Sequence, residues 1–79
     1  MPNDNDVIDR YFLEMRWRCL SLAADFDRIE RSLGGKQAMA TDPRLAKLRD
    51  AIKVLLQNEP GRAEKVQMIM SDQTPPPAR

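Results

Sequence analysis

The chain has 79 residues, a mass of 9.1 kDa and a net charge of +1, so it forms at most one small domain with no strong attraction for DNA or an anionic membrane. Histidine is absent and there is one cysteine, which excludes His-based catalytic triads, the usual Cys/His zinc sites and an intramolecular disulfide. Apolar residues make up 42% of the chain and charged residues 32%, a balance typical of a globular chain.

The composition favours helices. β-Branched residues are scarce, with three Val, four Ile and two Thr, and no stretch alternates apolar and polar residues for long enough to form a convincing strand. Leu, Ala, Arg, Met and Glu dominate, and all of them form helices readily. We therefore predict an all-α fold.

The first and longest predicted helix covers residues 6–33 and follows a disordered N-terminus at residues 1–5. It contains no Gly or Pro, and Asn5 or Asp6 can cap its start. Gly34 and Gly35 come next, and a glycine there can adopt the left-handed conformation that closes a helix. At about 1.5 Å per residue, this helix makes a rod of roughly 40 Å.

Two shorter helices are predicted after a connection at residues 34–41. Asp42 is a good N-cap and Pro43 suits the first helical position, which predicts a second helix over residues 43–57. Turn-forming residues at 58–61 precede a third helix over residues 60–71, and residues 73–79 are interpreted as a disordered Pro-rich tail.

We expect these helices to form a single helical domain over residues 6–72. The second and third helices together are about as long as the first. The prediction is a long N-terminal helix packed antiparallel on a two-helix return, as a helical hairpin of three helices.

The first predicted helix carries an apolar stripe, called here the first stripe, whose spacings alternate between four and three residues. It consists of Ile8, Phe12, Met15, Cys19, Leu22, Phe26, Ile29 and Leu33. We expect this stripe to pack against the two later helices, which have apolar faces of their own. These faces consist of Leu45, Leu48, Ile52, Leu55 and Leu56, and of Ala63, Val66, Ile69 and Met70.

A second stripe on the same helix consists of Leu13, Trp17, Leu20 and Ala24. It is centred about 160° around the helix from the first stripe. A helix that is buried on one side in a monomer should be polar on the other, so something is expected to cover the second stripe. We predict a second copy of the chain, giving a dimer that forms a helical bundle. The alternatives are a different helical protein, the third helix of the same chain, or shielding of Trp17 by neighbouring long side chains.

The acidic residues of the first helix do not predict a metal or acid–base site. Asp25 and Asp27 lie about 160° apart around the helix axis, so they cannot converge on one ion. Each is expected to form an ordinary surface ion pair instead, Asp25 with Arg28 and Asp27 with Arg31.

Arg10, Arg16 and Arg18 surround Trp17, and an aromatic residue among basic ones can indicate nucleic-acid contact. Glu14 lies four residues from both Arg10 and Arg18, however, so much of this positive charge is expected to be neutralised by ion pairing. Cys19 belongs to the first stripe, and we interpret it as an inert buried thiol.

These observations favour a non-enzymatic interaction or structural module, without a cofactor or metal, that self-associates through the second stripe. One alternative is a nucleic-acid-associated regulatory protein that uses the arginines of the first helix; another, weaker one is a carboxylate–metal protein or enzyme. Residues 1–6 lack the basic start and apolar run of a signal peptide, and no apolar stretch approaches the roughly 20 residues that span a bilayer. We therefore expect a cytoplasmic protein with no membrane partner.

Overall fold

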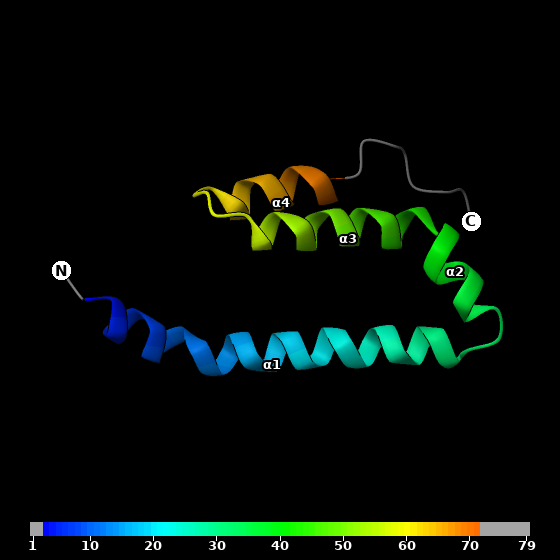
Figure 1. Cartoon of the computed structure of the whole chain (residues 1–79), viewed down its shortest axis with the longest axis horizontal. Helices are drawn as coiled ribbons and strands as arrows, with labels where there is room; N and C mark the ends of the chain where they lie inside the picture. The colour runs from blue at the N-terminus through cyan, green and yellow to red at the C-terminus, as the bar shows by residue number, and fades with distance from the viewer. Residues whose placement is uncertain (1–2, 72–79) are drawn as a thin grey trace. The chain divides into compact units, whose positions relative to one another are not determined.

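A computed structural model describes residues 3–71 of the chain. Four helices account for 84% of these residues and no strand occurs among them, which confirms the all-α prediction. The disordered tail expected at residues 73–79, like residues 1 and 2 of the expected disordered N-terminus, lies outside the described residues. The chain divides into two compact units, residues 1–38 and residues 39–79, and Figure 1 labels the helices in chain order.

The first unit consists mainly of helix α1, Asp4–Arg31. The side chain of Asn3 accepts a hydrogen bond from the Asp6 backbone N–H at 3.0 Å, so Asn3 is the N-cap. The helix therefore begins two residues earlier than expected, and Asp4 and Asn5, which were expected to be disordered, belong to its first turn. Acidic residues in this first turn and arginines in the last turn complement the helix dipole.

A tight corner follows α1. The Ser32 hydroxyl and backbone N–H both donate to the Ile29 carbonyl, at 2.6 and 3.1 Å. They provide hydrogen-bond partners for one of the carbonyl groups at the end of the helix. Gly34 adopts the left-handed conformation with φ +78°, as the sequence suggested. Gly35 is buried, and its backbone comes so close to α1 that a Cβ there would lie 1.7 Å from the Ile29 carbonyl oxygen.

The segment expected to be a connection, residues 34–41, is largely helical, which corrects the prediction. Helix α2, Gly35–Thr41, begins where the Ala38 N–H donates to the Gly34 carbonyl at 3.0 Å. The residues from Lys36 to Ala40 are mostly good helix formers. Gly34 turns the chain but does not prevent a new helix from beginning directly after it. The boundary between the two units falls within α2.

The second unit contains helix α3, Pro43–Leu56, with the expected start. The Asp42 carboxylate accepts from the Arg44 backbone N–H at 2.8 Å, and Pro43 occupies the first turn, where a donor is not needed. The Arg44 guanidinium donates to the same carboxylate at 2.8 and 3.1 Å. The Arg49 guanidinium donates to the Met39 carbonyl and so links α3 to the end of α2.

Helix α4, Arg62–Met70, folds back beside α3 instead of continuing in line with it (Figure 1). The reversal depends on Gly61, which is left-handed with φ +81°. The Arg62 guanidinium donates across the turn to the Gln57 carbonyl, and Lys65 pairs with Glu59 at 2.9 Å. The expected end-to-end return is therefore replaced by a short antiparallel hairpin of α3 and α4.

The interior of this hairpin differs from the expected one. The buried apolar residues are Ala51 and Val54 of α3, neither of which belonged to the predicted apolar face. A small residue such as Ala51 allows two helices to approach closely. Members of the expected faces that are instead exposed are Leu55, Leu56, Ala63 and Met70. Those that are half-buried are Leu45, Leu48, Ile52, Val66 and Ile69.

The cap of α3 makes a testable prediction about acid stability. Its hydrogen bonds with Arg44 lower the pKa of Asp42 to about 2, below the unfolded value of about 3.9. The carboxylate therefore stabilises α3 fully above about pH 4 to 5, and this contribution disappears as the pH falls through 2. We expect the NMR signal of the Arg44 amide to shift with the ionisation of Asp42, and helicity to fall in the same range.

Two variants control this experiment. Asparagine caps a helix about as well as aspartate, so Asp42→Asn should keep α3 at neutral pH and lose its part of the acid transition. Asp42→Ala should lower helicity at every pH, because the capping group itself is gone. An unchanged acid transition in Asp42→Asn would contradict the role given to this carboxylate. Glu59, whose pKa is lowered by Lys65, is present in both variants, so its own titration is common to them.

The corner after α1 makes a second prediction. In Gly35→Ala the new methyl group meets the Ile29 backbone, which cannot rotate away as a side chain can, so α2 must separate from α1. Gly34→Ala is the matched control, because its Cβ meets open space and the cost is only that of the left-handed backbone, about 1–2 kcal/mol. We expect Gly35→Ala to lower the urea midpoint measured by circular dichroism more than Gly34→Ala does; the reverse order would refute the close approach.

Candidate functional site

The second stripe lies along the N-terminal and middle turns of α1 and is open to solvent. Leu13 is 62% exposed, Trp17 58% and Leu20 48%, while Ala24 is half-buried. All four residues belong to one uninterrupted helix, and their spacings of four, three and four residues keep them on one face. They therefore form a single exposed apolar strip, which is the candidate site.

Arg16 covers part of the largest side chain in this strip. Its guanidinium carbon lies 5.6 Å from the centroid of the Trp17 ring, which is a cation–π distance. This is the kind of contact expected if long neighbouring side chains shield the indole. The ring nevertheless stays more than half exposed, so Arg16 shields only part of the indole.

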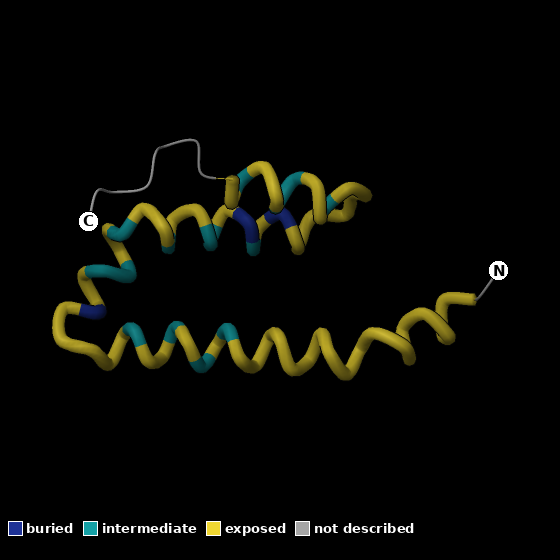
Figure 2. Tube along the Cα trace, turned by 180° about the vertical axis from the view of Figure 1, so that it is seen from behind, coloured by how far each residue is buried: buried dark blue, intermediate teal, exposed yellow. Residues whose placement is uncertain are grey.

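The first stripe is also exposed over the N-terminal half of α1. Ile8, Phe12, Met15 and Cys19 are exposed, whereas Leu22, Phe26 and Ile29 are half-buried (Figure 2). Cys19 is thus exposed rather than buried, which corrects the interpretation made from the sequence. Leu33, the last expected member, lies beyond the end of α1 and is fully exposed, because the helix ends before it.

Sequence reasoning overlooked two apolar residues that enlarge this surface. Val7 and Tyr11 are exposed and lie four residues apart beside the first stripe. Their spacing was the available signal, since residues four apart share a helix face. The N-terminal half of α1 therefore presents apolar side chains over most of its circumference.

The remaining face of α1 is polar, and two ion pairs neutralise part of its charge. Arg18 pairs with Glu14 at 3.0 Å and Arg28 with Asp25 at 2.6 Å, as the spacing predicted. These pairs are exposed, so they contribute little to stability. The Arg18–Glu14 pair does remove free positive charge beside Trp17, where Arg18 could otherwise contact a phosphate.

Two other expected pairs are not formed. Within residues 3–71 no ion pair joins Arg10 to Glu14 or Asp27 to Arg31, although the helical spacing allows both. Glu14 accepts from Arg18 through one carboxylate oxygen, and nothing in the structure explains why Arg10 does not pair with the other. The structure gives no explanation for the second case either.

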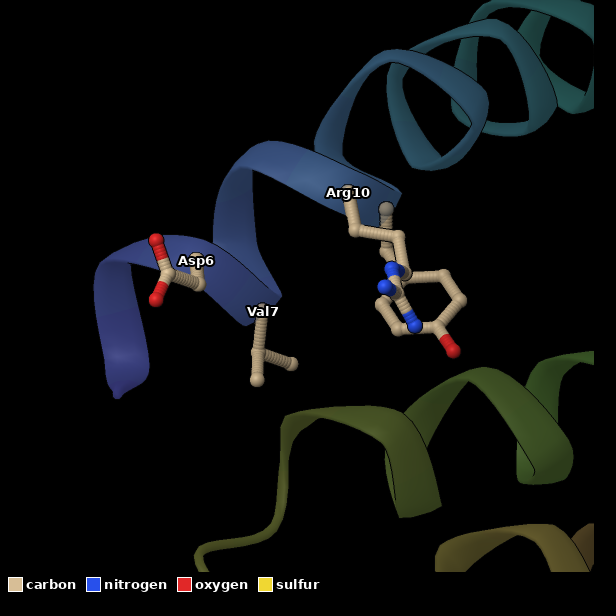
Figure 3. A pocket seen from close by; sticks show the side chains of 4 residues that line it. Asp6, Val7 and Arg10 are labelled. Carbon is tan, nitrogen blue, oxygen red and sulfur yellow. The ribbon is translucent and has the colours of Figure 1, made fainter. Parts of the chain in front are cut away.

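The described residues bring no set of three potential metal ligands together. Asp25 is occupied by Arg28, and no three carboxylate, thiol or imidazole groups cluster anywhere in residues 3–71. A shallow hollow of about 230 Å³ lies on the first turns of α1, lined by Asp6, Val7, Arg10 and Tyr11 (Figure 3). Its lining comes from neighbouring turns of one helix and includes one carboxylate and one guanidinium. The hollow is therefore a gap between side chains of that helix.

Over residues 3–71, every helix is too short or too polar to cross a bilayer. Comparison of the chain with protein-family models, with curated proteins and with solved structures found no match. The function must therefore be inferred from the surface of α1 itself.

The exposure of Cys19 gives a direct test of this surface. At a dilution where the chain is monomeric, a thiol reagent should modify Cys19 in the native chain at nearly the rate measured in denaturing urea, because no packing within one chain protects it. In a Cys19→Ser background, Ser21→Cys on the polar face provides the reference for an unhindered helix thiol. Strong protection of Cys19 relative to that reference at the same dilution would mean that the chain itself covers the first stripe.

Proposed function

We propose that this chain is a small non-enzymatic interaction module that self-associates through the second stripe, Leu13, Trp17, Leu20 and Ala24. The observation that carries the proposal is the exposure of three large apolar side chains on one face of a single helix. Contiguous apolar surface of this kind marks an interaction site in a protein, because leaving it in water is unfavourable.

The free energies allow such an association. Burying Leu13, Trp17 and Leu20 from two copies would supply about 9–18 kcal/mol at roughly 1.5–3 kcal/mol for each fully exposed side chain, and about half of that from their exposure of 48–62%. Joining two molecules costs about 4–15 kcal/mol in translational and rotational freedom. The balance allows a dimer of modest affinity, whose population depends on protein concentration.

The exposed half of the first stripe supports a bundle rather than a simple helix pair. Ile8, Phe12 and Met15 need cover on a different side of α1 from Trp17. Two copies that join through the second stripe would present this apolar surface to further helices, as the core of a helical bundle does. We therefore propose a dimer in which α1 belongs to a bundle of four or more helices.

Trp17→Glu tests the proposal against a closely matched control. Phe12 is 59% exposed and Trp17 58%, but they lie on different faces of α1, so a glutamate at either position removes an aromatic side chain of equal exposure. We expect the wild type to sediment as a dimer, Trp17→Glu as a folded monomer, and Phe12→Glu as a dimer. Helicity of each variant is measured alongside, and the Trp17 emission should shift to the red when the wild type is diluted.

Three results would contradict the proposal. A wild type that is monomeric at high micromolar concentration would show that no self-association occurs. Dissociation by Phe12→Glu but not by Trp17→Glu would assign the interface to the first stripe. A blue-shifted indole in a stable monomer would mean that the chain itself covers Trp17.

A further inference from the structure

We infer that the two α1 helices pair antiparallel, with Leu13 against the partner's Ala24 and Trp17 against the partner's Leu20. The inference rests on the proposed self-association and adds its direction and register. Three observations on α1 carry it: the order of large and small residues along the second stripe, the charges at its two ends, and the division of ion pairs between the faces of the helix.

The first observation is the order of side-chain sizes. In the antiparallel register the large Leu13 meets the small Ala24 at both ends of the stripe, and Trp17 meets Leu20 in the middle. A parallel pair would place the two Trp17 rings together and the two Ala24 methyl groups together. That arrangement crowds one layer and leaves a gap in another, whereas close-packed interfaces avoid both.

The second observation is the charge at each end of the same face. Asp6 lies seven residues before Leu13, and Arg31 lies seven residues after Ala24, so both continue the line of the second stripe. Asp6 belongs to the acidic first turn and Arg31 to the basic last turn. In an antiparallel pair, Asp6 of each copy meets Arg31 of the other, which gives two such contacts by symmetry. In a parallel pair, Asp6 meets the partner's Asp6 and Arg31 meets the partner's Arg31.

The third observation is which charges are already paired. The ion pairs within α1, Glu14 with Arg18 and Asp25 with Arg28, lie on the polar face. Within residues 3–71 no ion pair engages Asp6 or Arg31, although Arg10 and Asp27 lie four residues away from them along the helix. The charges at the ends of the second stripe are therefore free to pair with a second copy.

The charges at the edges of the stripe do not alter this result. Arg10 and Asp27 lie on opposite edges of the stripe. In this register Arg10 attracts the partner's Asp27, but Arg10 also approaches the partner's Arg28 along one edge and Asp27 approaches the partner's Asp9 along the other, so attraction and repulsion offset each other. The Asp6–Arg31 contacts lie on the centre line and decide the direction. Antiparallel helix dipoles, which attract each other, act in the same sense.

A charge exchange tests the direction. Arg31→Glu alone and Asp6→Lys alone should each weaken the dimer roughly tenfold, because both symmetric contacts become repulsive. The double variant Asp6→Lys/Arg31→Glu restores attraction in every antiparallel pair and should recover most of the wild-type affinity. In a parallel pair each single variant only replaces one like-charge contact with another, so unchanged affinity in both singles would overturn the inference.

Disulfide trapping gives a second, independent readout in a Cys19→Ser background. Mixing Leu13→Cys chains with Ala24→Cys chains under mild oxidation should give the mixed disulfide, with few disulfides between identical chains. Predominant Leu13→Cys homodisulfides would overturn the antiparallel register. Failure of the proposed function looks different, since the wild type would then be monomeric, or dimeric but insensitive to Trp17→Glu.

Discussion

An α-helix in a small protein is stabilised mainly by the apolar face that it buries, and helix α1 buries no residue fully within one copy of this chain. Its caps and its ion pairs fix where it begins and how its polar face is arranged, but each contributes little. The unmet requirement is cover for the apolar side chains of its N-terminal half. The proposals made for the chain, from the dimer to its direction, follow from that requirement.

The parts of the fold that sequence predicted are those that neighbouring residues determine. Asp42 and Pro43 specify the start of α3 because capping involves only the first turn, and Gly34 turns the chain because its backbone can be left-handed. Helix α2 was missed because its small and polar residues also suit a loop. The reversal at Gly61 was missed because a turn-forming sequence shows that a helix ends, but not the direction in which the chain continues.

The candidate site shows the same division between local and distant effects. Periodicity identifies the second stripe because it depends only on spacing along one helix, and the large members of the stripe are exposed, while its role as an interface stays a prediction. The burial of Cys19 was predicted wrongly because periodicity shows which residues share a face, but not whether another element covers them. Ala51 was overlooked for a related reason, since its importance lies in its small size at a helix contact.

In the proposed dimer, association and folding are coupled. A second copy that binds only the folded α1 stabilises it in proportion to how far its concentration exceeds the dissociation constant, so the order of α1 and the population of dimer rise together. Specificity then has to come from features that a generic apolar helix lacks. In the proposed antiparallel pair, Asp6 and Arg31 supply such a feature, because they favour one direction of pairing, while two ion pairs within α1 engage charges away from the centre line of the stripe. In the proposed dimer, apolar burial sets how strongly two copies associate, and the charges at the ends of the stripe set how they align.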